Sequence, residues 1–451
     1  MPDVTEPKLG HILRVALPIV ISRASYTVML FINRLFLSRV GKYELAAAMS
    51  GGLSSMVLSS FFESLVGYVT ALVAQYYGAG RRKMCTRATT QALFLALASY
   101  PILLCFVPLI KYVFVLTGQD ATLAALATVY AQFLLAGSIF VIIRTALGSF
   151  FIGIGKTRIV MIANIASTIV SVPLNYVFIF GKFGMPELGI RGAALGTICG
   201  SFFAFIVLLV YYLREISQES YKVANVLRFV PDIMKRLLRF GLPAGVEPFL
   251  NWFAFNIFVQ IMHSYGADTA AATTIAFNWD TIAFVPMLGL GTAATSVIGQ
   301  YIGAKDYDSA QRSIYLTLRV GVLYSLVMMA LFVGFTEPLV LVVSSGFEDA
   351  NGEIAKMAAT MLRLLAIYTI VNSSKLVLGG SLRAAGDTAW VMWVAIALHW
   401  AMAVGTIVLV RLVHAHQYVA WSTLIIMNIT HAASVFYRFR TNKWRKMALI
   451  G

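Results

Sequence analysis

The sequence predicts an all-α membrane protein with twelve transmembrane helices in two pseudo-symmetric lobes of six helices each. Hydrophobic residues make up 59% of its 451 residues and charged residues only 12%, a composition typical of a polytopic membrane protein. A repeat supports the two lobes: at a shift of 225 residues, Ala16-Leu17-Pro18 falls on Gly241-Leu242-Pro243 and Gln75–Ala79 falls on Gln300–Ala304. Two homologous halves with a binding site between them are a common transporter plan.

Apolar runs between charged residues or Gly/Pro breaks predict the individual spans, because a run of roughly 20 apolar residues can cross a bilayer. We place the spans near residues 12–33, 45–77, 88–114, 122–146, 158–181, 190–213, 236–263, 268–300, 313–344, 355–381, 386–411 and 417–437. The resulting domains are an N-terminal lobe (1–213), a connector (214–235), a C-terminal lobe (236–437) and a basic tail (438–451). Within the long polar stretch 214–239, residues 231–239 are expected to form a short amphipathic helix on the membrane surface.

The distribution of Lys and Arg predicts the orientation. Most of them lie on the side that holds both termini and the connector, so the positive-inside rule makes that side cytoplasmic. We therefore expect a multi-pass protein of the plasma membrane, which is the inner membrane in a Gram-negative cell. The net charge of +16 reflects this topology rather than nucleic-acid binding. The expected partners are membrane lipids and a small organic substrate, with the chain acting as a monomer.

Two carboxylates inside predicted spans are the leading candidates for ion coupling. Glu247 lies between Pro243 and Pro248 in the seventh span, and Asp280 lies in the eighth. A carboxylate at membrane depth costs about 2.5–3.5 kcal/mol or more and usually marks an ion or substrate path. If both face one cavity they could share a proton or a Na⁺ ion. The alternative is a structural pairing with a neighbouring donor.

Further polar and aromatic residues are candidates for lining a substrate cavity. Asn251 and Phe255 share a helical face with Glu247, Trp252 and Asn256 flank it, and Asn278 lies beside Asp280. These asparagines could help coordinate a cation or could bridge helices by hydrogen bonds. Elsewhere, the charged and amide residues expected to face a cavity or to pair are Arg23, Asn33, Glu63, Arg144, Asn372 and Lys375. An ion pair of Arg23 or Arg144 with Glu63 is the alternative to a substrate role. His263, His399 and His431 are expected to be structural.

No motif for covalent or hydrolytic chemistry and no nucleotide-binding motif occurs, so we expect neither an enzyme nor a pump driven directly by ATP. The scattered cysteines indicate no metal site. We expect no cofactor, only a coupling ion, H⁺ or Na⁺, with a possible Na⁺ position at Glu247 and Asp280. A membrane-embedded enzyme and a passive channel remain as other classes; product formation or single-channel currents would reveal them.

Several segments together resemble the multidrug and toxic compound extrusion (MATE) family over nearly the whole chain. The resemblance is strongest in Glu187-Leu188-Gly189-Ile190-Arg191-Gly192-Ala193-Ala194 and Leu382-Arg383-Ala384-Ala385-Gly386-Asp387-Thr388. It extends to Gly153–Thr157, Pro173–Tyr176, Gly241–Glu247 and Ile298–Ala304. The resemblance implies a V of two six-helix lobes and export of organic compounds coupled to H⁺ or Na⁺ entry.

The resemblance also assigns roles to particular positions, and this chain departs from some of them. Positions where the family or some of its members carry acids are amides here, at Asn33, Asn175, Asn251 and Asn372, and an amide does not titrate. Glu247 and Asp280 match acids of the DinF-like branch, so the coupling is expected there. Arg23, Arg34, Arg144 and Lys375 make the expected cavity less anionic than a cation exporter requires.

The sequence thus predicts a secondary antiporter that exports an organic solute from the cytoplasm by alternating access. The alternative is an exporter or flippase of an anionic or lipid-linked substrate that does not use the usual cation coupling of the family.

Overall fold

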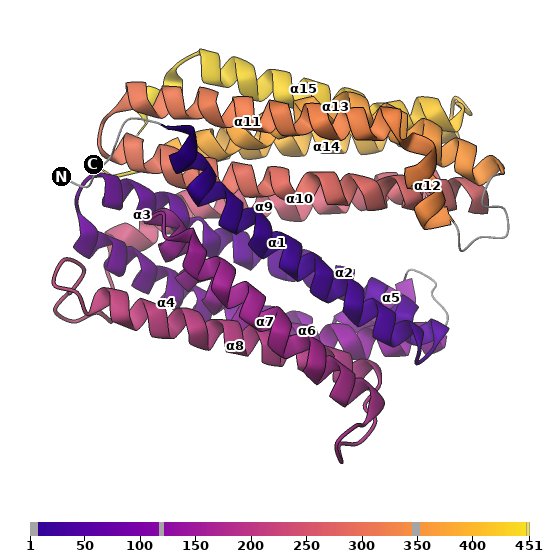
Figure 1. The fold of residues 1–451 in the computed structure, drawn as a ribbon, viewed down its shortest axis with the longest axis horizontal. Helices are drawn as coiled ribbons and strands as arrows, with labels where there is room; N and C mark the ends of the chain where they lie inside the picture. The colour runs from indigo at the N-terminus through magenta and orange to yellow at the C-terminus, as the bar shows by residue number, and fades with distance from the viewer. Residues whose placement is uncertain (1–7, 117–120, 345–351, 448, 451) are drawn as a thin grey trace. The chain divides into compact units, whose positions relative to one another are not determined.

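The computed structural model describes residues 8–116, 121–344, 352–447 and 449–450, and every regular element in that part of the chain is a helix (Figure 1). The first half contains α1 (Leu9–Ser38), α2 (Lys42–Gly67), α3 (Val69–Gly78), α4 (Arg82–Phe106), α5 (Ile110–Leu116), α6 (Ala121–Gly153), α7 (Thr157–Phe180) and α8 (Ile190–Ile216). The second half contains α9 (Pro231–His263), α10 (Ala267–Gly303), α11 (Tyr307–Gly334), α12 (Thr336–Ser344), α13 (Glu353–Ala385), α14 (Thr388–Arg411) and α15 (Gln417–Arg440), followed by a 3₁₀ turn (Lys443–Lys446).

Among the described residues, eleven helical stretches are long and apolar enough to cross a membrane, and α2 and α3 together form one of them. The predicted all-α membrane fold is therefore confirmed. The predicted seventh span is α9, which lies outside that set despite its 33 residues. Glu247, two prolines and two asparagines make its apolar part more polar than the other spans.

The helix ends repeat with the spacing found in the sequence. Four helix boundaries of the first half have counterparts 225 residues later: Ser38 and His263, Lys42 and Ala267, Gly78 and Gly303, Arg82 and Tyr307. The repeat is thus gapless through the first two spans of each half.

Three predictions about continuity are wrong. The predicted spans 88–114 and 313–344 are each split in two, after Phe106 and after Gly334. Pro108 lacks a backbone donor and Gly334 is a poor helix former, so each break has a local cause. In contrast, the predicted separate surface helix at 231–239 is the first part of the continuous helix α9.

The helices divide into two compact units, each described here by itself. The first unit comprises Leu17–Phe249, and the second comprises Leu250–Leu449 together with the first turns of α1 up to Ala16. The division therefore falls within α1 and within α9, whereas the sequence-based domains divide at the connector.

Small residues allow close helix packing within each unit. In the first unit α7 and α8 lie side by side, and a Cβ at Gly196 would collide with the side chain of Asn175. In the second unit α10 and α13 lie side by side, and a Cβ at Gly380 would collide with the carbonyl oxygen of Gly291. Such close backbone approach is typical of membrane helices.

The connector and the predicted tail are both packed against helices. The buried Gln91 side chain on α4 donates to the Arg228 carbonyl at 3.0 Å and accepts from the Val230 amide at 3.1 Å. In the tail, α15 continues to Arg440, and the buried Trp444 stacks on Phe439 with 5.9 Å between ring centroids.

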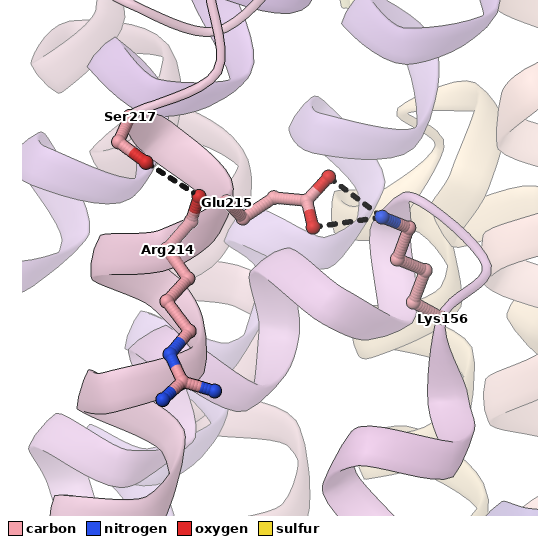
Figure 2. A network of polar contacts seen from close by, with 4 residues as sticks. All are labelled: Lys156, Arg214, Glu215 and Ser217. Atoms are coloured by element: carbon pink, nitrogen blue, oxygen red, sulfur yellow. Dashed lines mark hydrogen bonds and ion pairs between the residues drawn. The ribbon is translucent and has the colours of Figure 1, made fainter.

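An ion pair joins the α6–α7 turn to the end of α8. Figure 2 shows Glu215 turned toward Lys156, whose Nζ lies 2.7 Å from both carboxylate oxygens. Arg214, the neighbour of Glu215, points away from this pair, and its carbonyl accepts from Ser217. The pair lies at the end of the first unit that carries the connector.

Candidate functional site

Asp280 forms the best-defined acidic site within a span. It lies on α10, and its Oδ1 accepts a hydrogen bond of 2.6 Å from the Tyr368 hydroxyl on α13. The phenol hydroxyl satisfies one oxygen of a carboxylate that apolar helices surround. Hydrogen bonds to a carboxylate are among the stronger ones in proteins, so Tyr368 holds Asp280 in a defined position.

Lys375 places a positive charge in the same part of the second unit. Its Nζ donates to Asn428 Oδ1 on α15 at 2.6 Å. The Asn428 amide nitrogen donates to the Leu424 carbonyl at 2.9 Å, which turns the Asn428 oxygen toward the ammonium. Lys375 follows Tyr368, the donor to Asp280, by seven residues and so lies on the same face of α13.

Asn372 lies between these groups on α13. Tyr368, Asn372 and Lys375 are spaced by four and three residues, so they share one face of the helix. The Asn372 side chain is buried, and its Oδ1 has no hydrogen-bond partner among the described residues. A buried acceptor without a partner is unusual and calls for a donor or a cation.

Glu247 is buried in α9, with a relative exposure of 6%. Its helix packs closely on α2 here, since a Cβ at Gly245 would collide with the Phe61 carbonyl oxygen. Glu247 falls in the first unit and Asp280 in the second. A proton or Na⁺ shared by the two carboxylates therefore stays a prediction.

The aromatic residues predicted near Glu247 pack mainly on one another. Phe255 stacks on Phe258 at 6.3 Å and meets Phe277 edge-on at 5.1 Å, while Trp252 meets Phe255 edge-on. Trp279 donates to the Leu339 carbonyl at 2.9 Å, so it anchors α12.

The predicted asparagines of α9 and α10 lie in different environments. Asn251 Oδ1 is buried without a hydrogen-bond partner in the described part of the chain, Asn256 is half-buried and Asn278 is exposed. Their role in a cavity stays a prediction.

The first unit holds a basic cluster instead of an acidic one. The Arg144 guanidinium donates to Asn164 Oδ1 at 2.8 Å, and the Asn164 amide hydrogen-bonds the Ser22 hydroxyl. Within the described residues, no ion pair joins Glu63 to Arg144 or Arg23, so the alternative of a direct ion pair is not realised there. Glu63 is half-buried and Arg23 is exposed.

Two further amides of the first unit are buried. Asn33 Nδ2 lies 3.5 Å from the Tyr130 hydroxyl, and Asn175 Nδ2 lies 3.4 Å from Ser171 Oγ. Asn175 is wedged against Gly196 between α7 and α8, which is a packing position. The side-chain oxygens of both amides, Asn33 Oδ1 and Asn175 Oδ1, have no hydrogen-bond partner among the residues described.

Sequence reasoning missed the partners of the charged groups. Tyr368, Asn428 and Asn164 contact Asp280, Lys375 and Arg144 respectively. A signal existed for Tyr368, which precedes Lys375 by seven residues and hence lies on its helical face. Asn428 and Asn164 offered only the signal of an amide in an apolar span.

Comparisons with known proteins identify the family. The family model described as MatE matches residues 18–177 and again residues 243–408, so its two matches begin 225 residues apart. The multidrug resistance protein MdtK of Yersinia pseudotuberculosis (serotype O:1b, strain IP 31758) is 27% identical over 392 residues, covering 86% of this chain and 84% of MdtK. MdtK of Yersinia pestis (strain Pestoides F) matches to the same extent.

Solved structures of transporters have the same fold as this chain. A MATE transporter in complex with MaL6 superposes with a TM-score of 0.88 at 20% identity, covering 98% of both chains. A MOP superfamily transporter from Pyrococcus furiosus, described as having a binding pocket of reverse polarity, gives 0.87 at 19% identity, covering 98% of this chain and 97% of that one. The family match to both halves and the helical fold lead to one conclusion: this chain is a multi-pass membrane protein that belongs to the MatE family of transporters.

Proposed function

We propose that this protein is a secondary antiporter that exports organic solutes from the cytoplasm, coupled to entry of H⁺ or Na⁺. The observation that carries the proposal is the family match to both halves of the chain. Its relatives MdtK bear the name of multidrug resistance proteins. Membrane transporters that couple to an ion gradient need an intramembrane group that binds the ion, and Glu247 and Asp280 are the acids to which we assign this task.

The coupling step follows from the chemistry of a buried acid. Glu247 and Asp280 are the groups that bind the entering cation, which removes or compensates a buried negative charge. The ion thereby favours one of two states of the transporter, and its release favours the other. Both termini lie in the cytoplasm, and the protein resides in the plasma membrane as a monomer.

A second candidate is export of an organic anion, or flipping of a lipid-linked one. The observation that favours it is Arg144, whose hydrogen-bond partner is the neutral amide of Asn164. Arg23 and Arg34 lie on the neighbouring helix α1, and a guanidinium is well suited to bind a carboxylate or phosphate. The Pyrococcus transporter with reverse pocket polarity has the same fold.

Flux measurements in proteoliposomes test these proposals. A cationic and an anionic dye are offered under an imposed pH gradient and, separately, an imposed Na⁺ gradient. We expect wild-type export to follow one gradient and to fall at least about tenfold in Glu247→Gln. Asp280→Asn is expected to weaken coupling as well. Glu219→Gln is the matched control, since the Glu219 side chain is 84% exposed and lies outside the spans.

Gradient-driven export by Glu247→Gln at the wild-type rate would refute the coupling role. Movement of the anionic dye alone, lost in Arg144→Gln, would establish the second candidate in place of the first.

A further inference from the structure

We infer that Lys375 supplies the resident cation of the polar cluster formed by Asp280, Tyr368, Asn372, Lys375 and Asn428, so that this cluster exchanges protons and excludes Na⁺. For the coupling ion, this inference rests on the function proposed above. The binding claim itself concerns the second unit alone and is testable without transport.

The cluster joins three helices that pack on one another. Asp280 comes from α10, three residues come from one face of α13, and Asn428 comes from α15; α13 contacts both other helices. Two hydrogen bonds of 2.6 Å define its ends, from Tyr368 to Asp280 and from Lys375 to Asn428. Asn372 lies between them, one helical turn from each of its neighbours on that face.

The oxygens of this cluster are acceptors that suit a cation. Asp280 supplies a carboxylate, Asn428 directs its oxygen to Lys375, and Asn372 has a buried oxygen without a partner among the described residues. An ammonium group has three donors and no acceptor, so it binds the same kind of oxygen that would surround Na⁺. Lys375 reaches one oxygen of this set, that of Asn428, at 2.6 Å.

A positive charge already in place excludes a second one. Lys375 lies two helical turns from Tyr368, the donor to Asp280, on the same face of α13, so its positive charge belongs to the same cluster as the Asp280 carboxylate. A Na⁺ ion at Asp280 would face the Lys375 ammonium in a region of low dielectric constant, where like charges repel strongly. A proton differs, because it neutralises Asp280 by forming an O–H bond and occupies no coordination site.

The other titratable groups around Lys375 do not take over this role. His399 on α14 has Nδ1 2.7 Å from the Ala395 carbonyl oxygen, and its ring meets that of His431 on α15 edge-on at 5.9 Å. The His399 ring is thus held by its own helix, and the two rings pack on each other. Asp280, held by the Tyr368 hydroxyl, is the acid of the cluster and the group to which we assign the proton.

The test measures Na⁺ binding by thermal unfolding of the purified full-length protein in detergent. Each variant is melted in NaCl and in KCl at equal concentration and pH, so that ionic strength is matched. We expect wild type to melt at the same temperature in both salts. In Lys375→Met, Na⁺ occupies the vacated acceptors, and the melting temperature rises by about 2 °C or more in NaCl relative to KCl.

Two further variants make the result specific. Lys375→Gln also lacks the charge and serves if Lys375→Met does not fold. The double variant Asp280→Asn/Lys375→Met lacks the Asp280 carboxylate as well as the Lys375 ammonium. The Na⁺ response expected of Lys375→Met should therefore disappear in it. A Na⁺-specific stabilisation of wild type that Asp280→Asn abolishes would overturn the inference. So would folded Lys375→Met and Lys375→Gln proteins that show no Na⁺ response.

The outcome separates this inference from the proposed function. If the Na⁺ response appears on removal of Lys375 while wild-type vesicles export neither dye, the cluster assignment stands and the antiporter proposal falls. If wild-type export follows a Na⁺ gradient through Asp280, the antiporter proposal stands and the cluster assignment falls.

Discussion

The two halves carry the same ion pair with opposite polarity. In the first unit, Lys156 follows a glycine in the α6–α7 turn and pairs with Glu215 at the end of α8. In the second unit, Asp387 follows a glycine in the α13–α14 turn and pairs with Arg438 at the end of α15. The repeat has kept an ion pair at this position and exchanged which partner is the cation.

The two turns also share their backbone geometry. Gly155 and Gly386 have φ angles of 79° and 100°, in the left-handed region. The next amide, of Lys156 or Asp387, then bonds to the carbonyl five residues earlier, at 2.8 and 2.9 Å. This is the hydrogen bond of a helix that ends on a left-handed residue.

The pairs differ in burial. Lys156 is 48% exposed, whereas Arg438 is 14% exposed and donates to both oxygens of Asp387, at 2.6 and 3.1 Å. Arg438 also lies over the Trp390 ring, 5.2 Å from its centroid. The comparison indicates that the fold needs a charge pair here, and that the stabilisation it gives depends on how far the pair is removed from water.

The largest effect is expected on removing Arg438. Arg438→Met leaves the buried Asp387 carboxylate without its cation and should lower the free energy of unfolding by about 3 kcal/mol. Thermal unfolding in detergent measures the loss. Arg438→Lys, which keeps the charge and loses the two-point contact, should lose less. If Arg438→Met and wild type melt at the same temperature, burial does not determine how much this ion pair contributes to stability.

The shared turn geometry predicts equal effects in the two units. Gly155→Ala and Gly386→Ala each force an L residue into a left-handed conformation, at a cost of about 1–2 kcal/mol. The two variants should therefore melt at similarly lowered temperatures. A loss confined to one of them would mean that the two turns are not equivalent.

Removal of Lys156 should have a smaller effect than removal of Arg438. Lys156→Met is expected to cost about 1 kcal/mol, because water already reaches the half-exposed Lys156 and can solvate the Glu215 carboxylate once the ammonium is removed. The reversed pair Lys156→Glu/Glu215→Lys should recover stability relative to Lys156→Glu alone, as measured by the same unfolding assay. If stability is not recovered, the fold requires the cation at position 156 and the carboxylate at position 215.

The smallest effect is expected for an exposed pair in the connector. Lys222 Nζ donates to Glu219 Oε1 at 2.7 Å, with side chains 63% and 84% exposed. The hydrogen bond and charge of Lys222 lower the pKa of the Glu219 carboxyl, so its stabilisation would be lost as the pH falls below the ordinary carboxyl range. Solvent screening makes this loss too small to resolve, and Glu219→Gln should melt like wild type between pH 4 and 7. A clear difference would contradict the burial argument.

The sequence alone determined the membrane class, the approximate positions of the spans and the repeat, because composition and apolar run length are local properties. The 225-residue offset returned in the helix ends, and the family match begins at Pro18 and again at Pro243. The breaks at Pro108 and Gly334 were readable in principle from helix-breaking residues.

Only the tertiary structure decided which polar groups meet. Asp280 and Tyr368 are 88 residues apart in the chain, Lys375 and Asn428 are 53 apart, and Asp387 and Arg438 are 51 apart. A helical pattern shows which residues share a face but not which face of another helix it contacts. That choice depends on the packing of whole helices around small residues such as Gly291 and Gly380, so the partner of each buried charge emerges only when the helices are assembled.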